Sequence, residues 1–356
     1  MKNYILLFAA TAGAALAQGP QSLVVPAAHA SSDAVSFEWV PGASQDVHQQ
    51  TLVGPSHLGS IVGHQITGLS FRRTAANETY LGGTANMTVW LSTSPLPPLE
   101  CSAVYAANVG QDVTQVYQGM VSIPTSPAVV GVAVPWTPSN VIQIVFAQPF
   151  VYLGGTLCID IVGLTVSGQT TDWWMADAAY DYAIGTAVDI GPGCGSHANA
   201  LGQWSWVSPH TLLPGSTAGM SANGPEGNWA VAVVGPAGPA FPLPLLNLGQ
   251  PGCNAYLSDI LFLNVTAFWP TGEPLIQARG GVATYGLQIP NANWVLGAQM
   301  TTQWLDLVAQ NSSNAVTWTV ATAAPTLDMA LVDGVASDTT GNVSVYLAHV
   351  LRLEYQ

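Results

Sequence analysis

Two short runs decide the fold, Val141-Ile142-Gln143-Ile144-Val145-Phe146 and Leu157-Cys158-Ile159-Asp160-Ile161-Val162. In each run every second residue is large and apolar, beginning at Ile142 in the first and at Leu157 in the second. A period of two is the signature of β-strands, whose successive side chains point to opposite faces. Between the runs stand Pro149 and Gly154-Gly155, which predict a hairpin or a short connection rather than a helix.

The same pattern recurs along the chain. Further strands are predicted at Gln21 to Pro26, Val35 to Val40, His48 to Val53, Ser60 to Phe71, Met87 to Ser92, Trp229 to Val234, Leu257 to Phe268, Thr302 to Gln310, Ala315 to Ala321, Leu327 to Val332 and Val343 to Tyr355. The stretch from Gly168 to Trp206 is less regular, and we predict long loops with one short helix there. Short strands without heptads favour a sandwich or a jelly roll. We therefore predict an all-β protein: a β-sandwich or jelly-roll-like N-terminal domain, then a smaller β-sandwich C-terminal domain.

A Pro- and Gly-rich stretch predicts the boundary between these domains. Gly235-Pro236-Ala237-Gly238-Pro239 is followed by Pro242 and Pro244. Such residues punctuate chains at turns and linkers. The predicted organisation is a signal peptide over 1–17, a β-sandwich domain over 18–235, a linker over 236–244 and a smaller all-β domain over 245–356.

The first residues predict export. Lys2 precedes an apolar run from Tyr4 to Ala10, and Ala15-Leu16-Ala17 has the small residues of a signal-peptidase site. The apolar run is too short for a membrane span. Prolines repeatedly interrupt the long uncharged stretch from Val113 to Ile159, so we expect no membrane span after cleavage. The predicted location is secreted, at the extracellular surface.

Charge is scarce and one-sided. Charged residues make up 7% of the chain, against a typical proportion of roughly a quarter. Lys2 lies in the predicted signal, so the mature chain has nineteen acids against four arginines, a net charge of 4 − 19 = −15. Phosphate binding needs clustered cations, which argues against nucleic acid as a partner. Apolar residues make up 49%, enough to build cores.

Several motifs in the second half resemble those of a known group. They are Pro251-Gly252-Cys253, which echoes Pro192-Gly193-Cys194, then Leu287-Gln288-Ile289-Pro290-Asn291, Leu296-Gly297, Gln303-Trp304-Leu305-Asp306, Asn311 and Ser313-Asn314-Ala315. Their order resembles the small C-terminal β domain of an uncharacterised group of secreted proteins of planctomycete-type bacteria. The N-terminal part is similar in style to other exported bacterial β domains. The resemblance implies export and a β fold, and it carries no catalytic residues.

Four cysteines in an exported chain predict disulfides. They are Cys101, Cys158, Cys194 and Cys253, which allow three connectivities. We favour Cys101–Cys158 with Cys194–Cys253, because sequential pairing is locally simplest. A metal site or a nucleophile built from Cys194 and the nearby His197 lacks the ligand repetition or the third triad member that either would need.

Acidic and aromatic residues gather in the irregular region. Four carboxylates could supply oxygen ligands to calcium, which is the only cofactor that the sequence suggests. The alternative is that these acids lie in a solvated loop and bind no metal. They are Asp172, Asp177, Asp181 and Asp189. Six aromatic residues could stack on extracellular glycans, or pack beneath the loops as a small satellite core, which we favour. They are Trp173, Trp174, Tyr180, Tyr182, Trp204 and Trp206.

No motif of a known enzyme class stands out, so we expect a protein that is not an enzyme. The leading hypothesis is a secreted structural protein whose subunits assemble with one another into a filament, an appendage or a surface layer. The alternative is a carbohydrate-binding module or adhesin that uses the Trp173 to Trp206 region. A third is a hydrolase whose carboxylates no motif marks.

Overall fold

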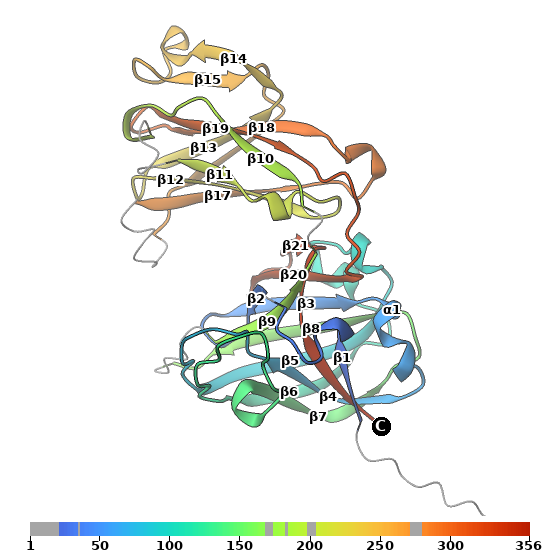
Figure 1. The fold of residues 1–356 in the computed structure, drawn as a ribbon. Helices are drawn as coiled ribbons and strands as arrows, with labels where there is room; N and C mark the ends of the chain where they lie inside the picture. Colours follow the sequence, from blue (N-terminus) through green and yellow to red (C-terminus); the bar gives the residue numbers. More distant parts are fainter. Residues whose placement is uncertain (1–20, 35, 168–173, 182–183, 198–203, 271–279) are drawn as a thin grey trace, which may run out of the picture.

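The computed structural model describes residues 21–34, 36–167, 174–181, 184–197, 204–270 and 280–356. Almost all of its regular structure is β, with two one-turn α-helices, α1 (Pro55–Leu58) and α2 (Tyr105–Asn108), among the described residues. The strands build two stacked layered bodies (Figure 1). The predicted all-β sandwich class is confirmed.

One body holds both the first and the last described strands, and we call it the terminal sandwich. Its strands are β1 (Gln21–Val25), β2 (Ser36–Trp39), β3 (Val47–Val53), β4 (Gln65–Arg72), β5 (Gly83–Ser94), β6 (Thr114–Ile123), β7 (Val141–Val151), β8 (Thr156–Thr165), β9 (Met175–Tyr180), β20 (Met329–Val335), β21 (Asn342–Ser344), β22 (Leu347–His349) and β23 (Leu351–Tyr355). They form a four-stranded sheet β1-β23-β4-β7, a six-stranded sheet β21-β20-β3-β8-β5-β6 and a small sheet β2-β9-β22.

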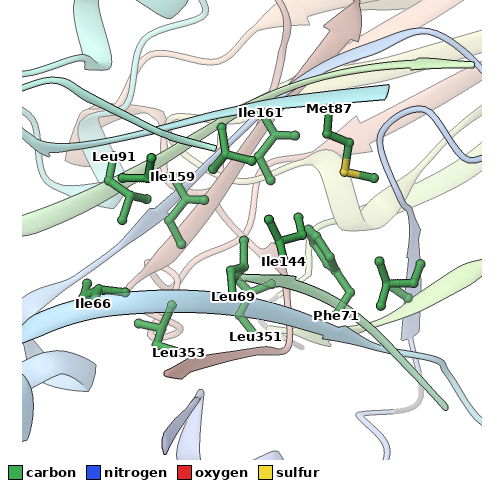
Figure 2. Packing of buried hydrophobic residues seen from close by; sticks show 14 of the residues in the cluster. Ile66, Leu69, Phe71, Met87, Leu91, Ile144, Ile159, Ile161, Leu351 and Leu353 are labelled. Carbon is green, nitrogen blue, oxygen red and sulfur yellow. The ribbon is translucent and has the colours of Figure 1, made fainter. Parts of the chain in front are cut away.

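The core of the terminal sandwich lies between its two large sheets (Figure 2). Leu69, Ile144 and Leu353 occupy one register row across β4, β7 and β23, and all three are buried. Ile159 and Ile161 of β8 face them from the opposite sheet (Figure 2). Burying a Leu or Ile side chain stabilises the fold by about 1.5–3 kcal/mol, so this double layer is a major source of stability.

The two runs that decide the fold form strands, as predicted, but not a hairpin. β7 pairs with β4, whereas β8 pairs with β3 and β5 in the opposite sheet. The short connection from Tyr152 to Gly155 therefore crosses between the layers. Gly154 and Gly155 both have positive φ there, a conformation that suits glycine.

The other body is inserted between β9 and β20, and we call it the inserted sandwich. Its strands are β10 (Thr186–Ile190), β11 (Ser205–Val207), β12 (Thr217–Gly224), β13 (Trp229–Gly235), β14 (Ala237–Pro242), β15 (Asn254–Leu257), β16 (Phe262–Ala267), β17 (Gly281–Gln288), β18 (Gln299–Asp306) and β19 (Asn311–Thr319). A five-stranded sheet β10-β19-β18-β13-β16 packs on the sheet β11-β12-β17 around a core with Trp304, Trp318 and Phe268. The pair β14-β15 stands outside the five-stranded sheet (Figure 1).

This pairing corrects the predicted domain boundaries. β13, expected to close the N-terminal domain, pairs with β16 and β18, and β20 to β23 return to the strands of the first 180 residues. The predicted linker over 236–244 is strand β14 and the start of a short 3-10 helix. A Cβ at Gly235 would lie 2.0 Å from the Asp259 carbonyl oxygen, and one at Gly238 2.5 Å from the Ser258 nitrogen. These glycines permit close backbone packing.

The irregular region also contains more order than predicted. β9 and β10 lie within 168–206, and each pairs with a strand distant in sequence. β11 begins in this region and pairs with β12, the next strand along the chain. Asp181 lies where the chain leaves the terminal sandwich. Its carboxylate accepts the backbone N–H groups of Thr326 and Leu327, where the chain returns. That carboxylate therefore ties the two crossing segments together.

Two adjacent arginines hold the long loops of the terminal sandwich. Arg72 forms a buried ion pair with Asp177 and donates to three backbone carbonyls. Arg73 is equally buried, but its hydrogen-bond partners are all neutral oxygens. These partners are the carbonyls of Thr74, Ala76, Glu78, Ser126 and Pro127 and the hydroxyl of Ser126. Its guanidinium carbon lies 4.1 Å from the ring centre of Tyr80.

Two carboxyl groups lie in a poorly solvated part of the terminal sandwich. Burial, then the charge of Asp333, raises the pKa of Glu38 to about 7. Burial likewise raises the pKa of Asp333 to about 6. Both values exceed those of unfolded carboxyls, so folding is favoured when these groups are protonated.

Glu38 and Asp333 should therefore stabilise the terminal sandwich less as the pH rises from about 4 to about 7. A carboxyl whose folded pKa is raised stabilises the protein below its unfolded pKa, and this contribution is lost as pH rises through the folded pKa. Glu38→Gln should remove on the order of 2 kcal/mol of that decline. Urea unfolding at pH 4.5, 6 and 7.5 checks this, with the exposed Glu226→Gln as control. Identical pH profiles for wild type and Glu38→Gln would contradict it.

Candidate functional site

The cysteines follow the predicted pairing in one half only. Cys194 and Cys253 form a disulfide across 59 positions of sequence. The predicted Cys101–Cys158 bond is wrong for this structure, because both residues are free and buried. They pack in one apolar cluster with Leu52, as small hydrophobic side chains do. Burial raises the pKa of Cys101 to about 12, which makes its thiol a poor nucleophile.

The Cys194–Cys253 bond should carry much of the stability of the inserted sandwich. Closing a loop of this length is worth about 4 kcal/mol of unfolding free energy in the chain-entropy model. A Cys194→Ser/Cys253→Ser variant should show a lower melting transition for the inserted sandwich in calorimetry. The control is Cys101→Ala, which removes one sulfur from the terminal sandwich. Unchanged melting of the double variant would contradict the prediction.

The predicted calcium ligands do not come together. Asp172 lies outside the described residues. Asp177 is paired with Arg72, Asp181 binds backbone N–H groups, and the side chain of Asp189 in β10 accepts from Asn314. Among the described residues no three His, Cys, Asp or Glu side chains gather closely enough to hold a metal ion. The described acids therefore serve the fold in separate places.

The predicted aromatic platform is also divided. Trp173 and Tyr182 fall outside the described residues. Trp174 is fully buried in the core of the terminal sandwich and donates its indole N–H to the Pro124 carbonyl at 3.1 Å. Tyr180 packs edge-on against His210 and Tyr346.

The other two aromatic residues belong to the inserted sandwich. Trp206 is in β11 and Trp204 precedes it, and both are half-buried. For Trp174 the satellite-packing alternative is the better description, because a ligand could reach its ring only if the core opened.

The most unusual surface of the described chain is at β16. This strand is the last in the five-stranded sheet and pairs there only with β13. It carries no charge and no proline. Soluble proteins commonly protect edge strands with charges, prolines or bulges, because unpaired N–H and C=O groups invite another strand. Here Leu263 is 57% exposed and Val265 is 51% exposed.

An apolar groove adjoins this edge. It measures about 610 Å³ and lies between the outer face of the five-stranded sheet and the β14-β15 pair. Val233 and Leu305 form part of its floor, and Phe241, Leu246 and Ile260 belong to its walls. Register pairing puts Leu263 beside Val233, so the groove continues into the exposed face of β16. Monomeric proteins rarely expose contiguous apolar patches above a few hundred Å².

The sheet holds the β14-β15 pair through a buried glutamine and the disulfide. The side chain of Gln303 in β18 accepts the Tyr256 N–H and donates to the Asn254 carbonyl, at 3.1 and 2.8 Å. Cys253 lies immediately before β15 and is bonded to Cys194. The groove walls are therefore fixed to the sheet.

We call β16 together with this groove the apolar edge. Its neighbourhood is nearly free of charge, since Asp259 is the one charged residue from 227 to 272. The sequence predicted a strand here, but it did not predict that the strand would be an exposed edge of its sheet. Both alternating faces of residues 260–265 are mostly apolar, as in a strand buried on both sides, and that pattern hides an exposed edge. In the described part of the chain, no helix is long and apolar enough to cross a membrane.

Comparisons with known proteins give no family. No family model matches the chain. The search of curated proteins also gives no match. One solved structure with a weak likeness is the cryo-EM structure of Broad Bean Stain Virus, at 11% identity over 90% of this chain and 93% of that chain. Its TM-score is 0.13, too low to support any inference about fold or function.

Proposed function

We propose that this protein is a secreted, non-enzymatic structural protein whose copies assemble through the apolar edge into an extracellular filament, appendage or surface layer. The observation that carries the proposal is β16, an apolar edge strand that pairs with no described strand on its outer side and lies beside an apolar groove. Strand addition at such an edge supplies main-chain hydrogen bonds, and the exposed side chains add apolar burial.

Charge favours a second copy of the same chain as the occupant. Among the described residues Arg72 and Arg73 are buried, and Arg352 is paired with Glu354. Two copies with a net charge near −15 repel each other, except where the facing surfaces carry almost no charge. The apolar edge is such a surface. A symmetric β16–β16 contact would close as a dimer, so growth into a filament needs a head-to-tail contact, with β16 of one copy against the groove of the next.

The Cys194–Cys253 disulfide of the inserted sandwich is consistent with an oxidising compartment, which supports the export predicted from the first residues. A low-charge surface also suits a crowded extracellular layer, because polar uncharged groups lose their hydration more cheaply than ions do.

Sedimentation velocity and negative-stain microscopy of the chain from Gln18 test the proposal. Regular polymers are expected above a critical concentration. They should grow with added salt, because screening weakens repulsion between like-charged copies. A chain that stays monomeric at high concentration and at every salt concentration would refute self-assembly.

A further inference from the structure

A second pocket lies on the terminal sandwich, far in sequence from the apolar edge. It measures about 280 Å³ and forms where β6 and β7, the neighbouring edges of the two large sheets, meet the loop that follows β6. Its polar and aromatic lining comes from Ser122, Trp136, Thr137, Gln143 and Arg352. Ser122, Thr137 and Gln143 are exposed and Trp136 is half-buried, so the pocket is open to a solute.

Unsatisfied polar atoms lie at the sheet beneath this pocket. Strand register puts Ser70 of β4 between Arg352 of β23 and Gln143 of β7, and opposite residues in paired strands share a face. Ser70 is fully buried and its hydroxyl has no hydrogen-bond partner. Two residues along on the same face, the Nε–H of Arg72 is also buried without a partner. Native proteins rarely leave such atoms unsatisfied, so these two polar atoms add polar character to the sheet beneath the pocket, although neither residue lines it.

Arg352 provides the charge in the pocket. Its Nε donates to Glu354 at 2.7 Å, and this is the one hydrogen bond of its guanidinium among the described residues. The Nη donors are therefore available. Its side chain is 20% exposed, whereas Arg72 and Arg73 are fully buried. A carboxylate is an acceptor-only group whose two oxygens match the guanidinium fork.

The indole restricts the ligand further. The guanidinium carbons of Arg352 and Arg72 both lie 4.9 Å from the ring centre of Trp136. The pocket offers the indole of Trp136, the guanidinium of Arg352, the amide of Gln143 and the hydroxyls of Ser122 and Thr137. These groups suit a sugar ring that has C–H faces, hydroxyl groups and one carboxylate. The pocket volume of about 280 Å³ lies just below the usual range for ligand sites, roughly 300–1,000 Å³, which limits the ligand to one small ring.

We propose that this pocket binds an acidic sugar unit, with its carboxylate on the Nη groups of Arg352, its ring against Trp136 and its hydroxyls on Gln143 and Ser122. Glu354 competes with the ligand carboxylate for the same guanidinium. This site is separate from the apolar edge, so a single acidic sugar unit binds each subunit whether or not the subunits assemble.

Calorimetry and ligand-observed NMR on the chain from Gln18 test the proposal, with glucuronate and galacturonate as probes and glucose and acetate as comparisons. We expect a uronate to bind at least about tenfold more tightly than glucose, because a hydrogen bond to a charged group is lost with the neutral sugar. Acetate should also bind at least about tenfold more weakly, since it makes no ring contacts.

Two variants of opposite sign make the test specific. Arg352→Gln should weaken uronate binding by about tenfold or more. Glu354→Gln should strengthen it, because the competing carboxylate is gone, and partial unfolding cannot mimic a gain in affinity. The exposed Gln143→Ala should weaken binding without changing the melting temperature. No uronate binding at millimolar concentration, equal binding of glucose or acetate, or weaker binding by Glu354→Gln would overturn the proposal.

Discussion

A Leu263→Glu variant stays monomeric at concentrations at which the wild-type chain assembles. Leu263 is the second residue of β16 and is 57% exposed, so the folded monomer tolerates the change with little effect on its stability. In an assembled pair of edges the new carboxylate would lose its water without gaining a cation. Burying such a charge costs several kcal/mol, which corresponds to a loss of about 100-fold or more in the association constant.

The matched control is Val188→Glu. Val188 is 60% exposed on β10, the opposite edge strand of the same five-stranded sheet. The Val188→Glu substitution adds the same charge to the same sheet as Leu263→Glu, so any effect of net charge alone appears in both variants. Sedimentation velocity and microscopy compare them at equal concentration and salt. Equal loss of assembly in both variants, or polymers of Leu263→Glu, would remove β16 from the interface.

An Arg73→Met variant loses about 3 kcal/mol or more of unfolding free energy, because several buried carbonyl acceptors lose their donor. Methionine fills a similar space but donates no hydrogen bond. The carbonyls that Arg73 binds come from two loops, 74–78 and 126–127, and they are left without a partner. An unsatisfied buried acceptor costs about 1–3 kcal/mol, and partial relaxation of the loops lowers the sum.

Arg352→Met is the comparison for that variant. Arg352 is partly exposed and its ion pair with Glu354 is of the surface kind, so its loss should cost less than about 1 kcal/mol. Urea denaturation of both variants at one pH gives the two values. If Arg73→Met does not fold, Arg73→Lys is measured instead. Lysine keeps the charge but not the planar fork, so it should still cost more than Arg352→Met. Equal effects at the two positions would contradict the structural role of Arg73.

Much of the candidate site could not be predicted from the alternation of apolar and polar residues, and the reason is physical. The run around Leu263 reads as a strand buried on both faces, because alternation records side-chain type and not what covers the strand. The stretch around Gly235 and Gly238 reads as a linker, because glycine serves flexible connections and close backbone packing equally well. For Trp174, aromatic content alone could not distinguish a ligand platform from a core position.

The sequence by itself determined the all-β class and the strands of the two opening runs. These depend on side-chain alternation, which is a local property of the chain. The sequential pairing of cysteines was right for Cys194–Cys253 only. The tertiary structure alone decided that β20 to β23 return to β3 and β4, that Cys101 and Cys158 stay unbonded, and that β16 is an edge. Each of these depends on which distant segments pair and which faces they leave uncovered, and a pattern that repeats every two residues carries no record of either.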